Sequence, residues 1–87
     1  MKSEVNMKKI YTLEQIADMA DVIINGFAVQ KIEAGFRVCN LNVADLPVSV
    51  FAEDGTLIET DTDGIELELE REYFKKALPF MTEDLYI

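Results

Sequence analysis

The stretch that decides the fold is a predicted β-hairpin, PVSVFAEDGTLIET at residues 47–60. Two short runs rich in β-forming residues, 47–52 and 56–60, flank a turn that ends in Asp54-Gly55. Asp-Gly is a strong hairpin signal because such tight turns need a residue with positive φ, which glycine adopts without strain. The sequence therefore predicts two antiparallel strands here.

Two further strands are predicted upstream of this hairpin. Residues 27–32 are rich in β-forming side chains, and a turn at 33–35 leads into a second strand at 36–41. A loop at 42–47 then connects this strand to the hairpin. Parallel strands would need crossovers of a dozen or more residues, and these connections are shorter. We therefore expect a four-stranded antiparallel meander.

A helix is predicted before the first strand, because Thr12 and Gln15 have the spacing of a capping box. Apolar residues then follow helical spacing, while acidic residues face away from them. Asn25-Gly26 is interpreted as the end of this helix, since glycine commonly takes the left-handed conformation there. The apolar positions of the predicted helix are Leu13, Ile16, Ala17, Ala20, Ile23 and Ile24.

The segment that follows the hairpin has an ambiguous local pattern. Residues 65–70 alternate an aliphatic residue with glutamate, which is the period-two pattern of a half-buried strand. Leucine and glutamate favour helices, however, and the segment continues without a break to Pro79. We therefore predict one helix at 64–78, with Asp63 and Glu66 as a capping pair.

These elements have the order α-β-β-β-β-α and predict a two-layer α+β fold, with a four-stranded antiparallel sheet and two helices on one face. A single small α+β domain is predicted at 10–87, after a flexible N-terminal arm at 1–9. The opposite face of the sheet is also partly apolar and needs cover. Either the terminal segments fold over it, through residues such as Phe80, Leu85 and Tyr86, or it is an interface between two copies.

Acidic residues dominate the charge of the chain, since 17 acids against 8 bases give a formal charge of −9. Such a surface repels phosphate backbones and anionic lipids, so nucleic-acid and membrane binding are disfavoured. Nine of the acids and one base, Arg71, lie between Glu53 and Glu72. This stretch is either a solvated surface or a patch for a basic partner or a cation.

Side chains suited to catalysis are scarce. The chain has no histidine, which excludes histidine-dependent triads and the usual zinc enzymes. Its serines, Ser3 and Ser49, have no histidine to activate them, and Cys39 lies in a predicted strand, where a buried, inert thiol is the usual outcome. The prediction is a protein that is not an enzyme, with no catalytic residue, cofactor site or metal site.

Residues 59–70 match part of the register of an EF-hand calcium loop. Acids fall at positions one, three, five and twelve, and Gly64 falls at the sixth position, where such a loop turns sharply. Three departures weaken the match. Glu59 replaces a shorter aspartate at position one, and Glu66 replaces an apolar residue at position eight. The element before the loop is also a predicted strand, where an EF-hand has a helix. The same residues also form an ordinary strand-to-helix turn, so the calcium loop stays an alternative. Its ligands would include Glu59, Asp61, Asp63 and Glu70.

The sequence alone leaves the function unknown. The leading interpretation is a small acidic, non-enzymatic protein-interaction or regulatory domain, whose partner is another protein or a second copy bound through the sheet as a homodimer. One alternative is an acidic decoy that binds a basic nucleic-acid-handling protein, and another is the calcium-binding loop. The cytoplasm is the predicted location, because one cysteine cannot form an internal disulfide and no apolar run of signal-peptide or membrane-spanning length is present.

Overall fold

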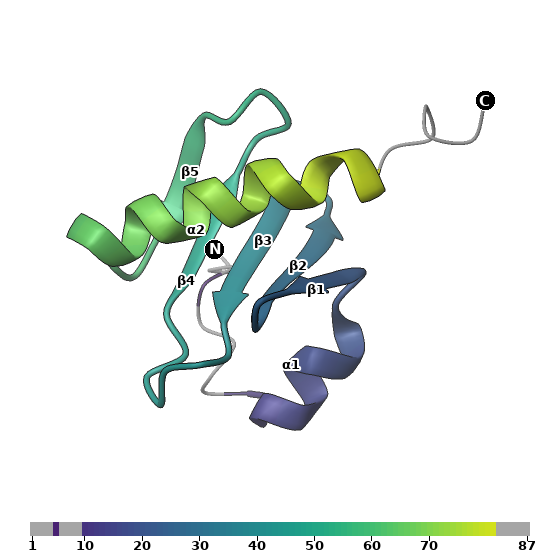
Figure 1. Cartoon of the computed structure of the whole chain (residues 1–87), viewed down its shortest axis with the longest axis vertical. Helices are drawn as coiled ribbons and strands as arrows, with labels where there is room; N and C mark the ends of the chain where they lie inside the picture. The colour runs from purple at the N-terminus through teal and green to yellow at the C-terminus, as the bar shows by residue number, and fades with distance from the viewer. Residues whose placement is uncertain (1–4, 6–9, 82–87) are drawn as a thin grey trace.

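A five-stranded antiparallel sheet forms the centre of the computed structural model, which describes residue 5 and residues 10–81 (Figure 1). The strands follow one another in chain order across the sheet, as the predicted meander requires. The α+β class with an antiparallel sheet and two helices is thus confirmed, but the sheet has five strands and not four. The elements are α1 (Leu13–Met19), β1 (Val22–Ile24), β2 (Phe27–Ile32), β3 (Gly35–Asn40), β4 (Val48–Phe51), β5 (Leu57–Thr60), α2 (Gly64–Ala77) and the 3₁₀ turn η2 (Leu78–Phe80).

The additional strand is β1, which occupies the second half of the predicted first helix. That helix ends at Met19, and Ala20 has an extended backbone. Asn25 and Gly26 both have positive φ, at 51° and 80°, so they form a two-residue hairpin turn that pairs β1 with β2. Asn-Gly is the preferred dipeptide for such a turn. The prediction that it ends a helix is wrong because the β-branched residues before it pair with β2 instead.

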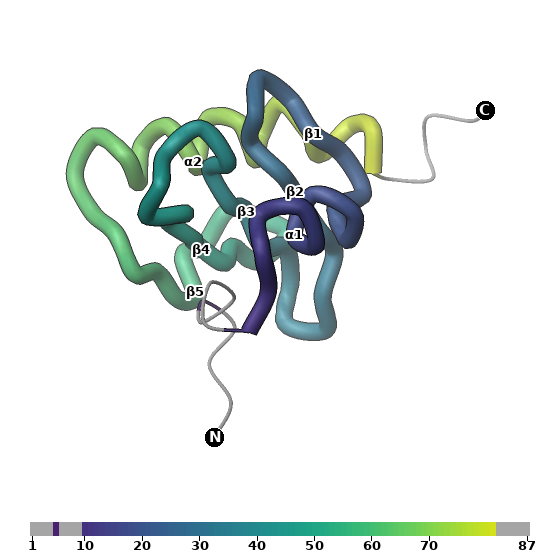
Figure 2. The backbone as a smooth tube through the Cα atoms, turned by 90° about the horizontal axis from the view of Figure 1, so that it is seen from below, coloured from purple at the N-terminus to yellow at the C-terminus, as the bar shows by residue number. Residues whose placement is uncertain are grey.

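The two helices lie on opposite faces of the sheet, so the prediction of two layers with both helices on one face is wrong. Helix α2 lies across one face, where Phe74 and Ala77 pack on the strands, and Ile16 of α1 packs on the other face. In Figure 2 helix α2 runs along the top of the view, and α1 lies lower, near β2 and β3. Side chains alternate between the faces of a strand, and both faces here are apolar. Cover is therefore needed on both sides.

Helix α2 confirms the prediction of one helix after the hairpin, and it resolves 65–70 as helical. Its predicted cap is wrong, however. Asp63 takes the N-cap position without a side-chain hydrogen bond to the helix. The capping box of α1 is confirmed, since Thr12 and Gln15 exchange backbone-to-side-chain hydrogen bonds of 2.9 and 3.1 Å.

The chain ends fall largely outside the described residues. Of the predicted arm at 1–9, only Val5 is described; it is 6% exposed and packs in the cluster beneath α1. Leu85 and Tyr86, predicted to cover the sheet, lie outside the described residues, and Phe80 is 64% exposed. Within the described part of the chain, no helix has the length and apolar character needed to cross a membrane.

Candidate functional site

The face of α2 that meets the sheet carries two acids, Glu66 and Glu70, one helical turn apart. Glu70 belongs to the same inward-facing row as Phe74, because residues four apart lie on one face of a helix. Phe74 packs on apolar residues of the sheet, and Glu70 meets polar residues of the sheet. The exposed fraction of Glu70 is 0%.

Three polar residues of the sheet face these acids. Ser49 Oγ and Glu70 Oε1 are hydrogen-bonded at 2.6 Å, and Ser49 Oγ lies 2.7 Å from Thr60 Oγ1 on the neighbouring strand. Asn40 Nδ2 donates to Glu66 Oε2 at 2.9 Å. The register explains this grouping, since Ser49 pairs with Thr60 and both side chains point towards α2. The polar side chains of the sheet thus pair with the two acids on the inward face of α2.

A polar cleft of about 260 Å³ opens beside this contact. Three carboxyl groups from separate segments line it: Asp45 from the β3–β4 loop, Asp61 from the β5–α2 loop and Glu66 from α2. Asp61 Oδ1 also accepts a hydrogen bond from the backbone N–H of Val48 at 2.9 Å, which fixes the loop against β4. The remaining lining residues are Val43, Pro47 and Thr62.

Glu70 has the most perturbed ionisation in this region. Burial raises its pKa from 4.5 to about 8, because an ionised carboxylate loses its hydration inside the protein. The hydrogen bond to Ser49 opposes this shift, and the negative charges of Glu66 and Asp61 add to it. Burial and the neighbouring acids thus favour the neutral carboxylic acid over the ionised carboxylate.

The structure does not assemble the residues of the calcium-loop alternative into a binding site. Glu59 lies on β5, Asp61 holds the β4 backbone, Asp63 is at the N-cap of α2, and Glu70 points into the α2–sheet contact. No group of three acidic, histidine or cysteine side chains in the described residues is arranged to hold a metal ion.

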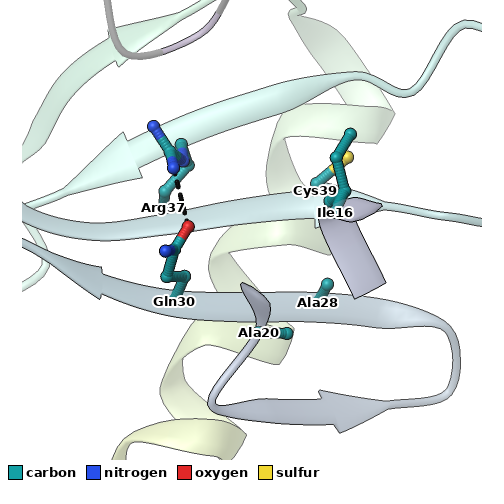
Figure 3. Close-up of a pocket in the computed structure, with 6 residues that line it drawn as sticks. All are labelled: Ile16, Ala20, Ala28, Gln30, Arg37 and Cys39. Carbon is teal, nitrogen blue, oxygen red and sulfur yellow. Dashed lines mark hydrogen bonds between the residues drawn. The ribbon is translucent and has the colours of Figure 1, made fainter. Parts of the chain in front are cut away.

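A second, narrow depression lies on the opposite face of the sheet, beside α1 (Figure 3). Cys39 is 1% exposed and forms no disulfide there. Arg37 Nη2 donates to Gln30 Oε1 at 2.6 Å across two neighbouring strands. Ile16, Ala20 and Ala28 supply the apolar wall. The depression therefore combines one buried thiol with a structural hydrogen bond.

The sequence pointed to Glu70 only as a calcium-loop ligand and as part of the acidic run, so its burial against the sheet was not predicted. The signal that could have found it is the spacing, since Glu70 follows Leu67 by three residues and precedes Phe74 by four. The hydroxyl partners Ser49 and Thr60 had no comparable signal, because they meet Glu70 only through the sheet register.

Comparison with known proteins identifies a family for this chain but no activity. No curated protein matches the chain, and no solved structure matches it. Residues 10–81 match a family described as Family of unknown function (DUF7723). The match covers the segment that contains both helices, all five strands, the acidic cleft and Glu70. The chain therefore belongs to this Family of unknown function (DUF7723).

Proposed function

We propose that the domain is a non-catalytic protein-interaction domain whose acidic cleft receives a basic side chain of a protein partner. The observation that carries the proposal is the arrangement of Asp45, Asp61 and Glu66 around one cleft. The side chains come from three segments, so folding gathers negative charge that the chain separates. A concentrated negative field attracts basic partners and favours their orientation in the encounter.

The size of the cleft supports a single side chain as its occupant. Sites for small-molecule ligands usually have volumes of about 300–1,000 Å³, and this cleft is smaller at about 260 Å³. Arginine fits the chemistry best, because its planar guanidinium forms paired hydrogen bonds with carboxylates. Its aliphatic stem can pack on Val43 and Pro47, which line the same cleft.

The burial of the reactive side chains supports a role without catalysis. Ser49 and Cys39 are two nucleophilic side chains of the sheet, and both are fully buried. Glu70, which has the raised pKa, is equally inaccessible. A catalytic group must come within hydrogen-bond reach of its substrate, and a substrate cannot approach these three residues in the folded domain.

Charge and redox chemistry support the proposed partner class and location. A formal charge of −9 opposes direct binding to nucleic acids and anionic membranes, which leaves a basic protein segment as the proposed partner. The proposed location is the cytoplasm, where a lone thiol such as Cys39 stays reduced. The more specific form of the proposal is an acidic decoy, in which the basic segment belongs to a nucleic-acid-handling protein.

A fluorescently labelled oligoarginine peptide tests the cleft. We expect it to bind the wild-type domain, with an affinity that falls as salt screens the charges. The variant Asp45→Asn/Glu66→Gln should bind about tenfold more weakly, which corresponds to roughly 1.4 kcal/mol. The matched control Glu53→Gln/Glu68→Gln removes the same charge from exposed positions outside the cleft.

The comparison between the two double variants decides the outcome. An affinity retained by the control and lost by the cleft variant supports the proposal. Equal losses in both would mean that the peptide senses only net charge, and the proposal would be wrong. For the decoy form, a partner isolated with the wild-type domain should lose its nucleic acid when the domain is added, and should keep it when the cleft variant is added.

A further inference from the structure

Glu70, Ser49 and Thr60 form a chain of hydrogen bonds that lacks one proton if Glu70 is ionised. Glu70 Oε1 contacts Ser49 Oγ at 2.6 Å, and Ser49 Oγ contacts Thr60 Oγ1 at 2.7 Å. Thr60 Oγ1 in turn donates to the carbonyls of Val48 and Thr62, at 3.3 and 3.1 Å. Each hydroxyl carries a single proton. Two hydroxyl protons therefore have to serve three successive links.

A proton on Glu70 completes the chain. Thr60 then donates to the backbone, Ser49 donates to Thr60, and Glu70 donates to Ser49. If Glu70 were ionised, Ser49 would donate to Glu70 and Thr60 to Ser49. Thr60 Oγ1 would then face the carbonyl oxygens of Val48 and Thr62 without a proton to share. The other oxygen of Glu70, Oε2, is buried and has no hydrogen-bond partner. A neutral carbonyl-type oxygen tolerates that position far better than an oxygen sharing a full negative charge.

We propose that Glu70 carries a proton in the folded domain and donates it to Ser49, so that this contact is a pH-sensitive latch between α2 and the sheet. The latch requires the buried carboxyl group, the two hydroxyl groups and the backbone carbonyls beyond them. It does not depend on what the acidic cleft binds.

The surroundings of Glu70 favour its neutral form. Glu66, on the same helix, and Asp61, on the β5–α2 loop, are the neighbours whose charges act on it, and both are acids. Strands β4 and β5 offer it the neutral hydroxyl groups of Ser49 and Thr60. Hydrogen bonding from Ser49 and from the backbone N–H of Asn40 on β3 opposes the pKa shift, and burial outweighs it. The adjacent Arg71 points to the β4–β5 turn, where its Nη1 donates to the Gly55 carbonyl at 2.7 Å. The raised pKa of Glu70 agrees with this arrangement.

The latch has a defined direction of pH dependence. In the unfolded chain Glu70 ionises near its ordinary pKa of 4.5, whereas in the folded domain it keeps its proton up to about pH 8. Between these values the folded state binds more protons than the unfolded state, so the stability falls as the pH rises. Below pH 4.5 both states are protonated, and above pH 8 both are ionised, so the contribution of Glu70 stops changing.

Two measurements on the full chain test the latch. The carboxyl ¹³C resonance of Glu70, assigned with Glu70→Gln, should titrate near pH 8. In urea unfolding from pH 5 to pH 8, the folding equilibrium constant of the wild type should fall relative to Glu70→Gln by on the order of a few hundredfold. The amide of Gln mimics the protonated acid, because its NH₂ group can donate to Ser49.

Glu68→Gln is the matched control, because it removes the same charge from an exposed position of the same helix. Its pH profile should run parallel to that of the wild type. A Glu70 titration midpoint between pH 4 and 5 would overturn the proposal, as would a constant stability difference between the wild type and Glu70→Gln across this range. If Glu70→Gln fails to fold, the wild-type resonance alone decides, assigned by through-bond correlation.

Discussion

Asn25 Nδ2 donates a hydrogen bond of 2.9 Å to the hydroxyl of Tyr73, which joins the β1–β2 turn to α2 across 48 positions of the chain. The ring of Tyr73 also stacks on Phe27, with the ring centroids 4.4 Å apart. One polar and one aromatic contact therefore connect the edge hairpin to the helix that covers its sheet.

The two contacts of Tyr73 should be separable by substitution. Tyr73→Phe loses only the hydrogen bond, and we expect it to reduce the free energy of unfolding by about 0.5–1.5 kcal/mol. Tyr73→Ala also loses the stacked ring, so it should cost roughly 2 kcal/mol more. Urea denaturation measures both values, with Tyr11→Phe as an exposed control that leaves stability unchanged. Equal costs for Phe and Ala would show that the stacking contributes nothing.

Phe74 is expected to be the most costly aromatic residue to truncate. It is buried, and its ring lies against Phe36 and Phe51, at centroid distances of 5.5 and 5.2 Å. Phe74→Ala should lower the free energy of unfolding by about 3–5 kcal/mol, because a cavity remains in the core. The control Phe80→Ala removes an exposed ring and should change stability by about 0.5 kcal/mol or less. Similar denaturation midpoints for the two variants would contradict this account of the core.

Gly26 and Gly55 should differ in their tolerance of alanine. Both have positive φ, at 80° and 94°, so alanine is strained at either position. A Cβ on Gly26 would also collide with the side chain of Asn42, whereas the space around Gly55 is open. We expect about 1 kcal/mol of destabilisation for Gly55→Ala and a clearly larger loss for Gly26→Ala. A thermal melt that ranks the two variants in the opposite order would contradict this.

Calcium should leave the melting temperature unchanged. A true site would add about 2.7 kcal/mol at a hundredfold excess over its dissociation constant. Asp61 is engaged with the backbone of Val48, and Glu70 is buried against Ser49, so neither is poised to bind the ion. A rise in melting temperature with millimolar calcium, absent with magnesium and lost in Asp61→Ala, would restore the calcium-loop alternative.

Both faces of the sheet are covered within the described part of the chain, since Val50 on one face and Phe51 on the other are fully buried. We therefore expect sedimentation equilibrium at tens of micromolar to give a monomer at both low and high salt. A dimer that strengthens with salt, as screening reduces the repulsion between two acidic chains, would reinstate the homodimer.

The elements that could be predicted depend on residues close together in the sequence. The capping box of Thr12 and Gln15 and the Asp54-Gly55 turn each act within about four positions, and the structure confirms them. The Asn25-Gly26 turn was misinterpreted because the same dipeptide suits a helix end and a hairpin. Pairing of Val22 with Val29 in the sheet decides between the two.

The candidate site could be predicted only in part, for a related reason. Helical spacing alone places Glu70 in the row of Leu67 and Phe74, but local spacing contains nothing about Ser49, which lies 21 positions away. Asp61 and Glu66 belong to the acidic run visible in the sequence, whereas Asp45 lies outside it, and the cleft that brings the three together was not predicted.

By itself, the sequence determined the acidic charge, the absence of histidine, the strand-and-turn pattern and the helical character of 65–78. These are properties of composition and of near neighbours. Tertiary structure alone decided the fifth strand, the placement of the helices on opposite faces and the proton on Glu70. Each of these depends on which distant side chains are removed from water together, and the cost of desolvating a carboxyl group is set by the surroundings that folding creates.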